Sequence, residues 1–86
     1  MELVVDGQRA ELVYELDGDL MTIVHTSVPE QIANHGLAGL LVRAAVEKAH
    51  VNGLTVVPLC PYARAWLKQH PDEAQSIDVD WKVGRS

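Results

Sequence analysis

Several classes of protein are excluded by what the 86-residue sequence lacks. Its single cysteine rules out an internal disulfide and favours a reducing compartment, so we expect a cytoplasmic protein. No apolar run approaches the ~20 residues of a membrane span, and no basic region opens a signal peptide. The 7 Lys and Arg are scattered among 12 Asp and Glu, giving a net charge of -5. Because nucleic-acid binding rests on clustered basic residues, we expect neither a nucleic acid nor a membrane as partner.

The composition that remains is that of one globular domain. Hydrophobic residues make up 48% and charged residues 22% of the chain, which is typical of folded proteins. No internal repeat or low-complexity tract divides the sequence. Since single domains typically span ~50–200 residues, we expect residues 1–86 to form one domain with a thin core.

The first third of the chain indicates three antiparallel strands. Runs rich in apolar or β-branched residues occupy positions 3–5, 10–16 and 20–28. Asp6-Gly7 and Asp17-Gly18, which separate these runs, are hairpin turn signals. Pro29 lacks the N–H group that a further ladder bond needs, so we expect it to close the third strand.

A helix and a buried strand follow. Between Gly36 and Asn52 apolar residues recur at helical spacing, and the predicted apolar face consists of Leu37, Leu40, Leu41, Ala44 and Ala45. The run 54–59 is apolar almost throughout, as in a strand buried on both faces. A strand, a helix and a strand in succession predict a right-handed crossover whose two strands are parallel.

The chain then leaves the sheet and begins a second helix. Pro58 removes a ladder hydrogen bond, so we expect the strand to separate from its neighbour there. Cys60 is the expected N-cap of the second helix, with Pro61 in the first turn and Pro71 at its end. Residues 77–81 alternate like an edge strand. The predicted fold class is α/β (α+β): an antiparallel three-stranded meander, a β-α-β crossover and a second helix.

Two features of this topology meet at one edge of the sheet. The loop 29–36 enters the first helix, where unpaired backbone N–H groups and the helix dipole favour a phosphate. Cys60 follows the parallel strand at the same edge, which is where ligands of open α/β sheets bind. A strand held apart at Pro58 leaves backbone groups to pair with an extended amide-containing ligand, and this shape fits a phosphopantetheine arm. The alternative is a structural loop, because two glycines before a helix also occur in loops that bind nothing.

The sequence resembles the small, cysteine-containing members of the GCN5-related N-acetyltransferase superfamily, which are little more than an acetyl-CoA-binding core. The resemblance covers roughly residues 8–71 and rests on the segments HTSVPE (25–30), GLAGLL (36–41) and VVPLCPY (56–62). It implies acetyl-CoA as cosubstrate, with the N–H groups of residues 34–39 holding the pyrophosphate and the strand around Val28 pairing to the pantetheine. The residues assigned to CoA binding on this basis are Val28, Asn34, His35, Gly36, Leu37, Ala38, Gly39, Leu40, Pro61 and Tyr62.

One position departs from the superfamily loop, which usually reads Gln or Arg, two residues, Gly, one residue, then Gly or Ala. Gly36 and Ala38 fit this pattern, but the leading position is Ala33. Because backbone amides form the cradle, we expect the missing side chain to weaken CoA binding without abolishing it. His35 or Gln31 would substitute in part.

Cys60 and His25 are the candidate catalytic residues. The dipole of a helix N-terminus favours a thiolate, so Cys60 would accept the acyl group covalently or lie beside the thioester during direct transfer. The alternative for Cys60 is a buried, inert cysteine. His25 would be the general base for an acceptor amine. Its expected place on the Met21 and Ile23 face also fits a structural histidine.

Other side chains give weaker signals. Tyr62 and Trp66, one turn apart on the second helix, would either cover the ligand or fill the core. The acidic residues near the C-terminus lack the spacing and partners of a metal site, so no metal is expected.

Two functions from different classes fit these observations. The first is an acetyl-CoA-dependent N-acetyltransferase that moves an acyl group to a small amine or a protein lysine. The second is a CoA-binding module or sensor without transfer activity, which the short chain favours because fuller acetyltransferases shape the acceptor site with additional N-terminal helices. A homodimer or a partner protein would complete that site. A purely structural α/β domain is the third interpretation.

Overall fold

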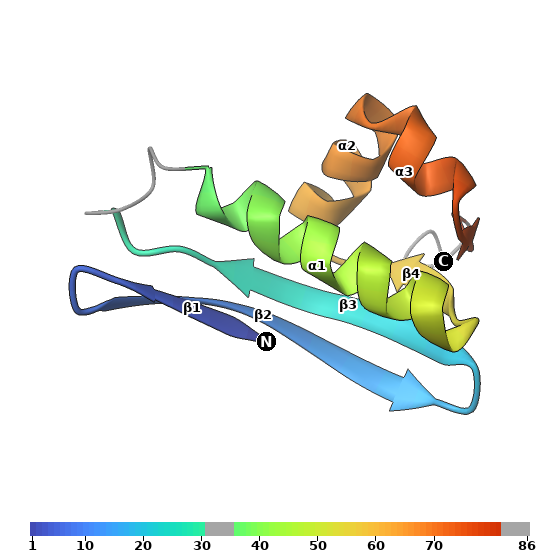
Figure 1. Cartoon of the computed structure of the whole chain (residues 1–86), viewed down its shortest axis with the longest axis horizontal. Coiled ribbons are helices and arrows are strands. Elements are labelled where there is room, and N and C mark those ends of the chain that lie inside the picture. The colour runs from blue at the N-terminus through green and yellow to red at the C-terminus, as the bar shows by residue number, and fades with distance from the viewer. Residues whose placement is uncertain (31–35, 82–86) are drawn as a thin grey trace.

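The computed structural model describes residues 1–30 and 36–81, in which five strands form one mixed sheet with three helices over one face (Figure 1). The elements in chain order are β1 (Glu2–Val5), β2 (Gln8–Asp17), β3 (Leu20–Ser27), α1 (Leu37–Asn52), β4 (Thr55–Pro58), α2 (Pro61–Gln69), α3 (Pro71–Gln75) and β5 (Asp78–Val79). The strand order is β1-β2-β3-β4-β5. β1, β2 and β3 pair antiparallel, whereas β4 is parallel to both of its neighbours. The predicted meander, crossover and second helix are confirmed.

Both hairpins turn through residues with left-handed backbone. Asp6 (φ 52°) and Gly7 (φ 76°) join β1 to β2 in the geometry that matches the twist of paired strands. The second loop consists of Gly18 (φ 60°) and Asp19, because Asp17 still forms the last pair of the ladder. The second turn therefore lies one residue later than the sequence predicted.

One stripe of α1 packs on the sheet and supplies much of the core. Its buried side chains are Leu37, Leu41, Val42, Ala45, Val46 and Ala49. The predicted face was wrong at Leu40, which is 52% exposed, and at Ala44, which is also exposed. Apolar residues lie on more than one side of α1, and contact with the strands selects the side that includes Val42 and Val46. The sheet contributes Ala10, Leu12, Met21, Ile23 and Val56 to the same cluster.

A register shift between β2 and β3 leaves one residue of β3 unpaired with β2. Val13 pairs with His25 and Tyr14 pairs with Ile23, so Val24 has no partner in β2. An extra residue of this kind is a β-bulge, and it reverses the alternation of side chains along the strand that contains it.

The reversal exchanges the faces on which two neighbouring side chains lie. Thr26 pairs with the buried Leu12, so it lies on the face covered by the helices, because directly opposed side chains share a face. His25 pairs with the exposed Val13 and is itself exposed on the other face. The prediction that His25 lies on the same face as Met21 and Ile23 is therefore wrong.

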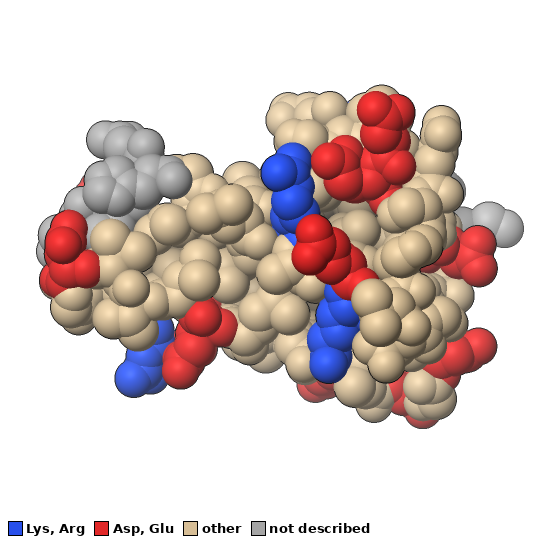
Figure 2. Space-filling model, in the orientation of Figure 1, with Lys and Arg blue, Asp and Glu red and all other residues tan. Residues whose placement is uncertain are grey.

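The charged surface is mostly acidic. Figure 2 shows Asp and Glu side chains at both ends of the face that it displays, with the Lys and Arg side chains apart from one another. Arg9 and Glu2 form an exposed ion pair at 3.4 Å, and Arg43 and Glu73 form another at 3.3 Å. Such pairs contribute little, so the fold depends mainly on the apolar core. No helix within the two described ranges is long and apolar enough to cross a membrane.

Candidate active site

The carboxyl ends of β3 and β4 lie at one edge of the sheet, which we call the carboxyl edge. The two strands are parallel over their whole pairing, so the chain leaves both of them at this edge. α1 and α2 begin after them, at Leu37 and Pro61. Neither helix has an acidic residue in its first turn. The carboxyl edge therefore receives the N-terminal, positive ends of two helix dipoles.

β3 and β4 separate at Pro58, as the sequence predicted. Pro58 is the last residue of β4 that pairs with β3, opposite Ile23. The N–H group of Cys60 then donates to the carbonyl oxygen of Ile23 at 2.9 Å, which fixes the start of α2 against β3. β3 continues through residues 24–27, and along this stretch no strand of the described chain pairs with it on the β4 side. Among the described residues, this stretch of β3 is therefore an open backbone edge.

Cys60 lies between the open edge of β3 and the first turn of α2. It is the N-cap of α2, with extended backbone (φ -69°, ψ 125°), and Pro61 follows as the first helical residue, as predicted. Cys60 is 4% exposed, and its thiol donates a hydrogen bond to the Thr26 hydroxyl, with 3.6 Å between Sγ and Oγ1. The thiol is therefore enclosed, with a polar group beside it.

The first turn of α1 forms the described part of the predicted phosphate cradle. Gly36 is its N-cap in left-handed conformation (φ 68°), and no side chain in the described part of the chain caps the helix. The N–H groups of Leu37, Ala38 and Gly39 have no partner within the helix, because the first bond back to Gly36 comes from Leu40 at 3.2 Å. The other residues named above for the predicted phosphate-binding loop lie outside the described residues: Gln31, Ala33, Asn34 and His35.

Gly39 lets α2 approach α1 closely beside this turn. A Cβ atom at Gly39 would lie 3.1 Å from Nε1 of Trp66 and 3.5 Å from the Tyr62 hydroxyl. The first distance is tighter than ordinary van der Waals contact, so the Trp66 ring would have to shift by a few tenths of an ångström to admit a side chain here. Trp66 is 6% exposed, whereas Tyr62 is 43% exposed. Trp66 thus fills the core, and Tyr62 lies at the surface of the carboxyl edge.

Neighbouring side chains fix Trp66 in place. Its ring stacks on His70 with centroids 4.0 Å apart, and the Arg43 guanidinium lies 5.7 Å from its centroid. Nδ1 of His70 is 2.8 Å from the Trp66 carbonyl oxygen. The Arg43 contact joins α1 to α2, whereas both His70 contacts lie within α2 and its C-cap.

His25 and Cys60 do not meet. Their side chains lie on opposite faces of β3, since Thr26 and not His25 points toward the helices. Thr26 is therefore the residue near the thiol that sequence reasoning missed. Regular alternation would place it away from the core, and only the unpaired Val24 reverses that expectation.

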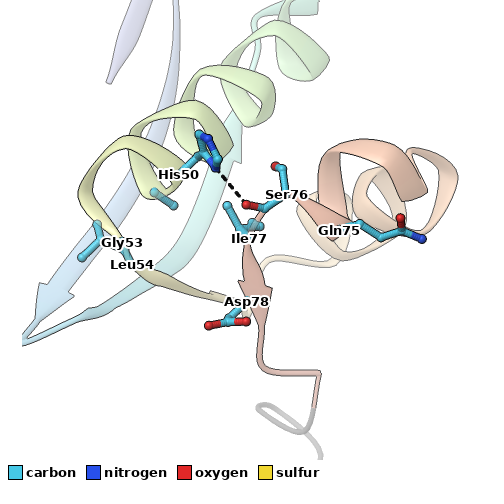
Figure 3. A pocket seen from close by; sticks show the side chains of 8 residues that line it. His50, Gly53, Leu54, Gln75, Ser76, Ile77 and Asp78 are labelled. Atoms are coloured by element: carbon cyan, nitrogen blue, oxygen red, sulfur yellow. Dashed lines mark hydrogen bonds between the residues drawn. The ribbon is translucent and has the colours of Figure 1, made fainter.

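Two hollows lie near the opposite edge of the sheet, which we call the amino edge. A cavity of about 200 Å³ is lined by Ala49, His50, Gly53, Leu54, Gln75, Ser76, Ile77 and Asp78 (Figure 3). Nδ1 of His50 lies 2.9 Å from the Ser76 carbonyl oxygen across this cavity. A groove of about 370 Å³ adjoins it between α1 and α3. α1 ends here, and the carbonyl groups of a helix C-terminus repel anions, so this edge does not suit a phosphate.

The described ranges hold no group of three or more His, Cys, Asp or Glu side chains that could bind a metal ion.

A family model described as "GCN5-related N-acetyl-transferase" matches residues 1–77. No curated protein matches the chain. The matched range contains every described part of the carboxyl edge: Thr26, the first turn of α1, Cys60 and the first turn of α2.

Proposed function

The chain belongs to the GCN5-related N-acetyltransferase family, and on this premise we propose that it transfers an acetyl group from acetyl-CoA to an amine of a small molecule or to a protein lysine. The arrangement of the carboxyl edge supports the proposal. Cys60 adjoins the open stretch of β3 and shares its edge with the N-terminus of α1. These features supply a nucleophile, a backbone edge and an anion site.

Acetyl-CoA matches the chemistry of these groups. The N–H groups of Leu37, Ala38 and Gly39 suit its pyrophosphate, with no acidic side chain in that turn to repel it. The open edge of β3, residues 24–27, suits the amides of the pantetheine arm. The surface side chains that we assign to its apolar parts are Val28, Leu40, Pro61 and Tyr62.

In the proposed reaction Cys60 accepts the acetyl group first. The Cys60 thiolate attacks the thioester carbon of acetyl-CoA, and a bond forms between Sγ and the acetyl group. The bond between the acetyl group and the CoA sulfur breaks, and the CoA sulfur takes up the proton that the Cys60 thiol released. A neutral amine then attacks the acetyl carbon on Cys60. The amide forms, Sγ leaves, and a proton from the amine returns to the thiol. The dipole of α2 stabilises the thiolate in both steps.

This scheme gives His25 no part, because its side chain lies on the opposite face of β3 from Cys60. We therefore expect His25→Ala to transfer acetyl groups at the rate of the unmodified protein. A marked loss of rate in His25→Ala would restore the interpretation of His25 as general base. We propose that a second copy of the chain or a partner protein contributes to the acceptor site.

Incubation with acetyl-CoA followed by intact-mass measurement tests the proposal. We expect one acetyl adduct on the protein and none on Cys60→Ser. Both proteins should gain thermal stability with acetyl-CoA, about 2.7 kcal/mol at a hundredfold excess over Kd. Absence of a shift with both CoA and acetyl-CoA would refute the proposal.

The remaining outcomes separate the alternatives. A thermal shift with no adduct and no product from a panel of amines would identify a CoA-binding module without transfer activity. Product from both the unmodified protein and Cys60→Ser, with no adduct on either, would identify direct transfer between thioester and amine.

A further inference from the structure

We propose that Thr26 is a positioning residue for Cys60, holding the sulfur at the end of α2 and donating a hydrogen bond to it once the thiol has lost its proton. In the resting protein the direction is the reverse, with the thiol donating to the hydroxyl over 3.6 Å. A hydroxyl rotates to suit its partner, so it can accept from the thiol and donate to the thiolate. This role rests on the proposed acyl transfer through Cys60.

Two bonds to the same strand fix the position of Cys60. Its backbone N–H donates to Ile23 at 2.9 Å, and its side chain bonds to Thr26, three residues further along β3. The backbone bond fixes where α2 starts, and the hydroxyl fixes the direction in which the sulfur points. Thr26 reaches the sulfur because the unpaired Val24 turns its side chain to the helix-covered face.

Other groups on the first turn of α2 have separate partners or positions. The Arg64 guanidinium donates to the carbonyl oxygen of Trp81, and the Tyr62 hydroxyl lies over Gly39. On β3, His25 lies on the opposite face from the thiol. None of these side chains changes in the variants proposed below, so a difference among the variants reports on the hydroxyl of Thr26.

The test is a titration of the thiolate by its ultraviolet absorbance in the absence of acetyl-CoA, with Cys60→Ser as the blank. A hydrogen bond to the charged form of a group favours that form. Thr26→Val removes the donor with nearly the same shape, so we expect the midpoint of the titration to move upward. Thr26→Ser retains a hydroxyl and should titrate like the unmodified protein.

Thr22→Val is the matched control, because Thr22 lies on the same strand and pairs with Val57, away from the thiol. Its midpoint should not move. Below both midpoints, alkylation of Cys60 in Thr26→Val should slow by about threefold, since the smaller thiolate fraction is offset in part by greater intrinsic nucleophilicity. Thr26→Ala removes the same hydroxyl and replaces Thr26→Val if that variant does not fold.

The proposal is overturned if Thr26→Val titrates like the unmodified protein, or if Thr22→Val moves the midpoint by the same amount. Both measurements use the protein without ligand. Failure to form the acetyl adduct would therefore count against the proposed function and leave the titration result standing.

Discussion

The carboxyl and amino edges of the sheet are built from the two ends of the same elements. The carboxyl edge offers a ligand backbone N–H groups, whereas the amino edge offers carbonyl groups. At the carboxyl edge α1 begins, with Gly36 as N-cap at φ 68° and N–H groups facing outward. At the amino edge α1 ends, with Gly53 as C-cap at φ 65° and carbonyl groups facing outward. The one basic residue in the last turn of α1 is His50. One helix thus gives the two edges opposite charge preferences.

Under the proposed function, the cavities of this fold do not mark the ligand site. The hollows of about 200 and 370 Å³ lie near the C-terminal half of α1, away from Cys60. A ligand that lies along an open strand and at a helix start needs exposed backbone groups more than an enclosed volume. For the proposed ligand, strand direction is therefore a better indication of the binding position than cavity volume is.

The largest expected effect tests whether the carboxyl edge depends on the contact between α1 and α2. Trp66→Ala removes a nearly buried ring that touches Gly39, His70 and Arg43, so we expect a loss of about 3–5 kcal/mol in the free energy of unfolding. Urea denaturation measures it. Tyr62→Ala, at a residue 43% exposed, is the control and should lose far less. Equal losses in the two variants would contradict a fixed helix contact at this edge.

The glycines at the two ends of α1 form a matched pair that separates stability from ligand binding. Nothing lies within 4 Å of a Cβ at Gly36 or Gly53, so alanine at either position adds only backbone strain. Each variant should lose about 1–2 kcal/mol of stability. Gly36→Ala should also bind acetyl-CoA about tenfold more weakly, the effect of misplacing one hydrogen bond to a charged group.

Denaturation and calorimetric titration with acetyl-CoA measure the two quantities. Gly53→Ala should bind acetyl-CoA as the unmodified protein does, because it alters the opposite end of α1. Equal affinity in both variants would show that the first turn of α1 does not hold the phosphates.

The smallest expected effect concerns the amino edge alone. His50→Ala removes the interaction between Nδ1 and the Ser76 carbonyl, at a side chain that is exposed, so we expect a loss of no more than about 1 kcal/mol. Acetyl transfer and acetyl-CoA affinity should stay unchanged. A loss of acetyl transfer or of acetyl-CoA affinity in His50→Ala would indicate that the ligand binds near the cavity of Figure 3.

Local sequence signals were sufficient where the structure depends on local geometry. Asp6 and Gly7 adopt left-handed backbone and form the first hairpin, Pro58 ends the pairing of β4 with β3, and Cys60 and Pro61 start α2. Each of these outcomes follows from the backbone preferences of one or two residues.

The sequence was insufficient where packing chose between similar local options. Leu40 and Val42 are both apolar residues of α1, and only the position of the sheet decides that Val42 is buried. The faces of His25 and Thr26 depend on the unpaired Val24, which no local composition marks. The sequence thus predicted that Cys60 starts α2 after the parallel strand, but not which side chain lies beside the thiol.

The strand order also has a consequence for synthesis of the chain. Because the order in the sheet equals the order in the sequence, each new strand can dock on the strand made just before it as the chain leaves the ribosome. The hairpins of β1 to β3 close first, since their loops are short. Thr26 and Cys60 are 34 positions apart and meet only when α2 docks. We therefore expect the Cys60 thiol to be open to oxidants until α2 docks, and a reducing environment would protect it through that interval.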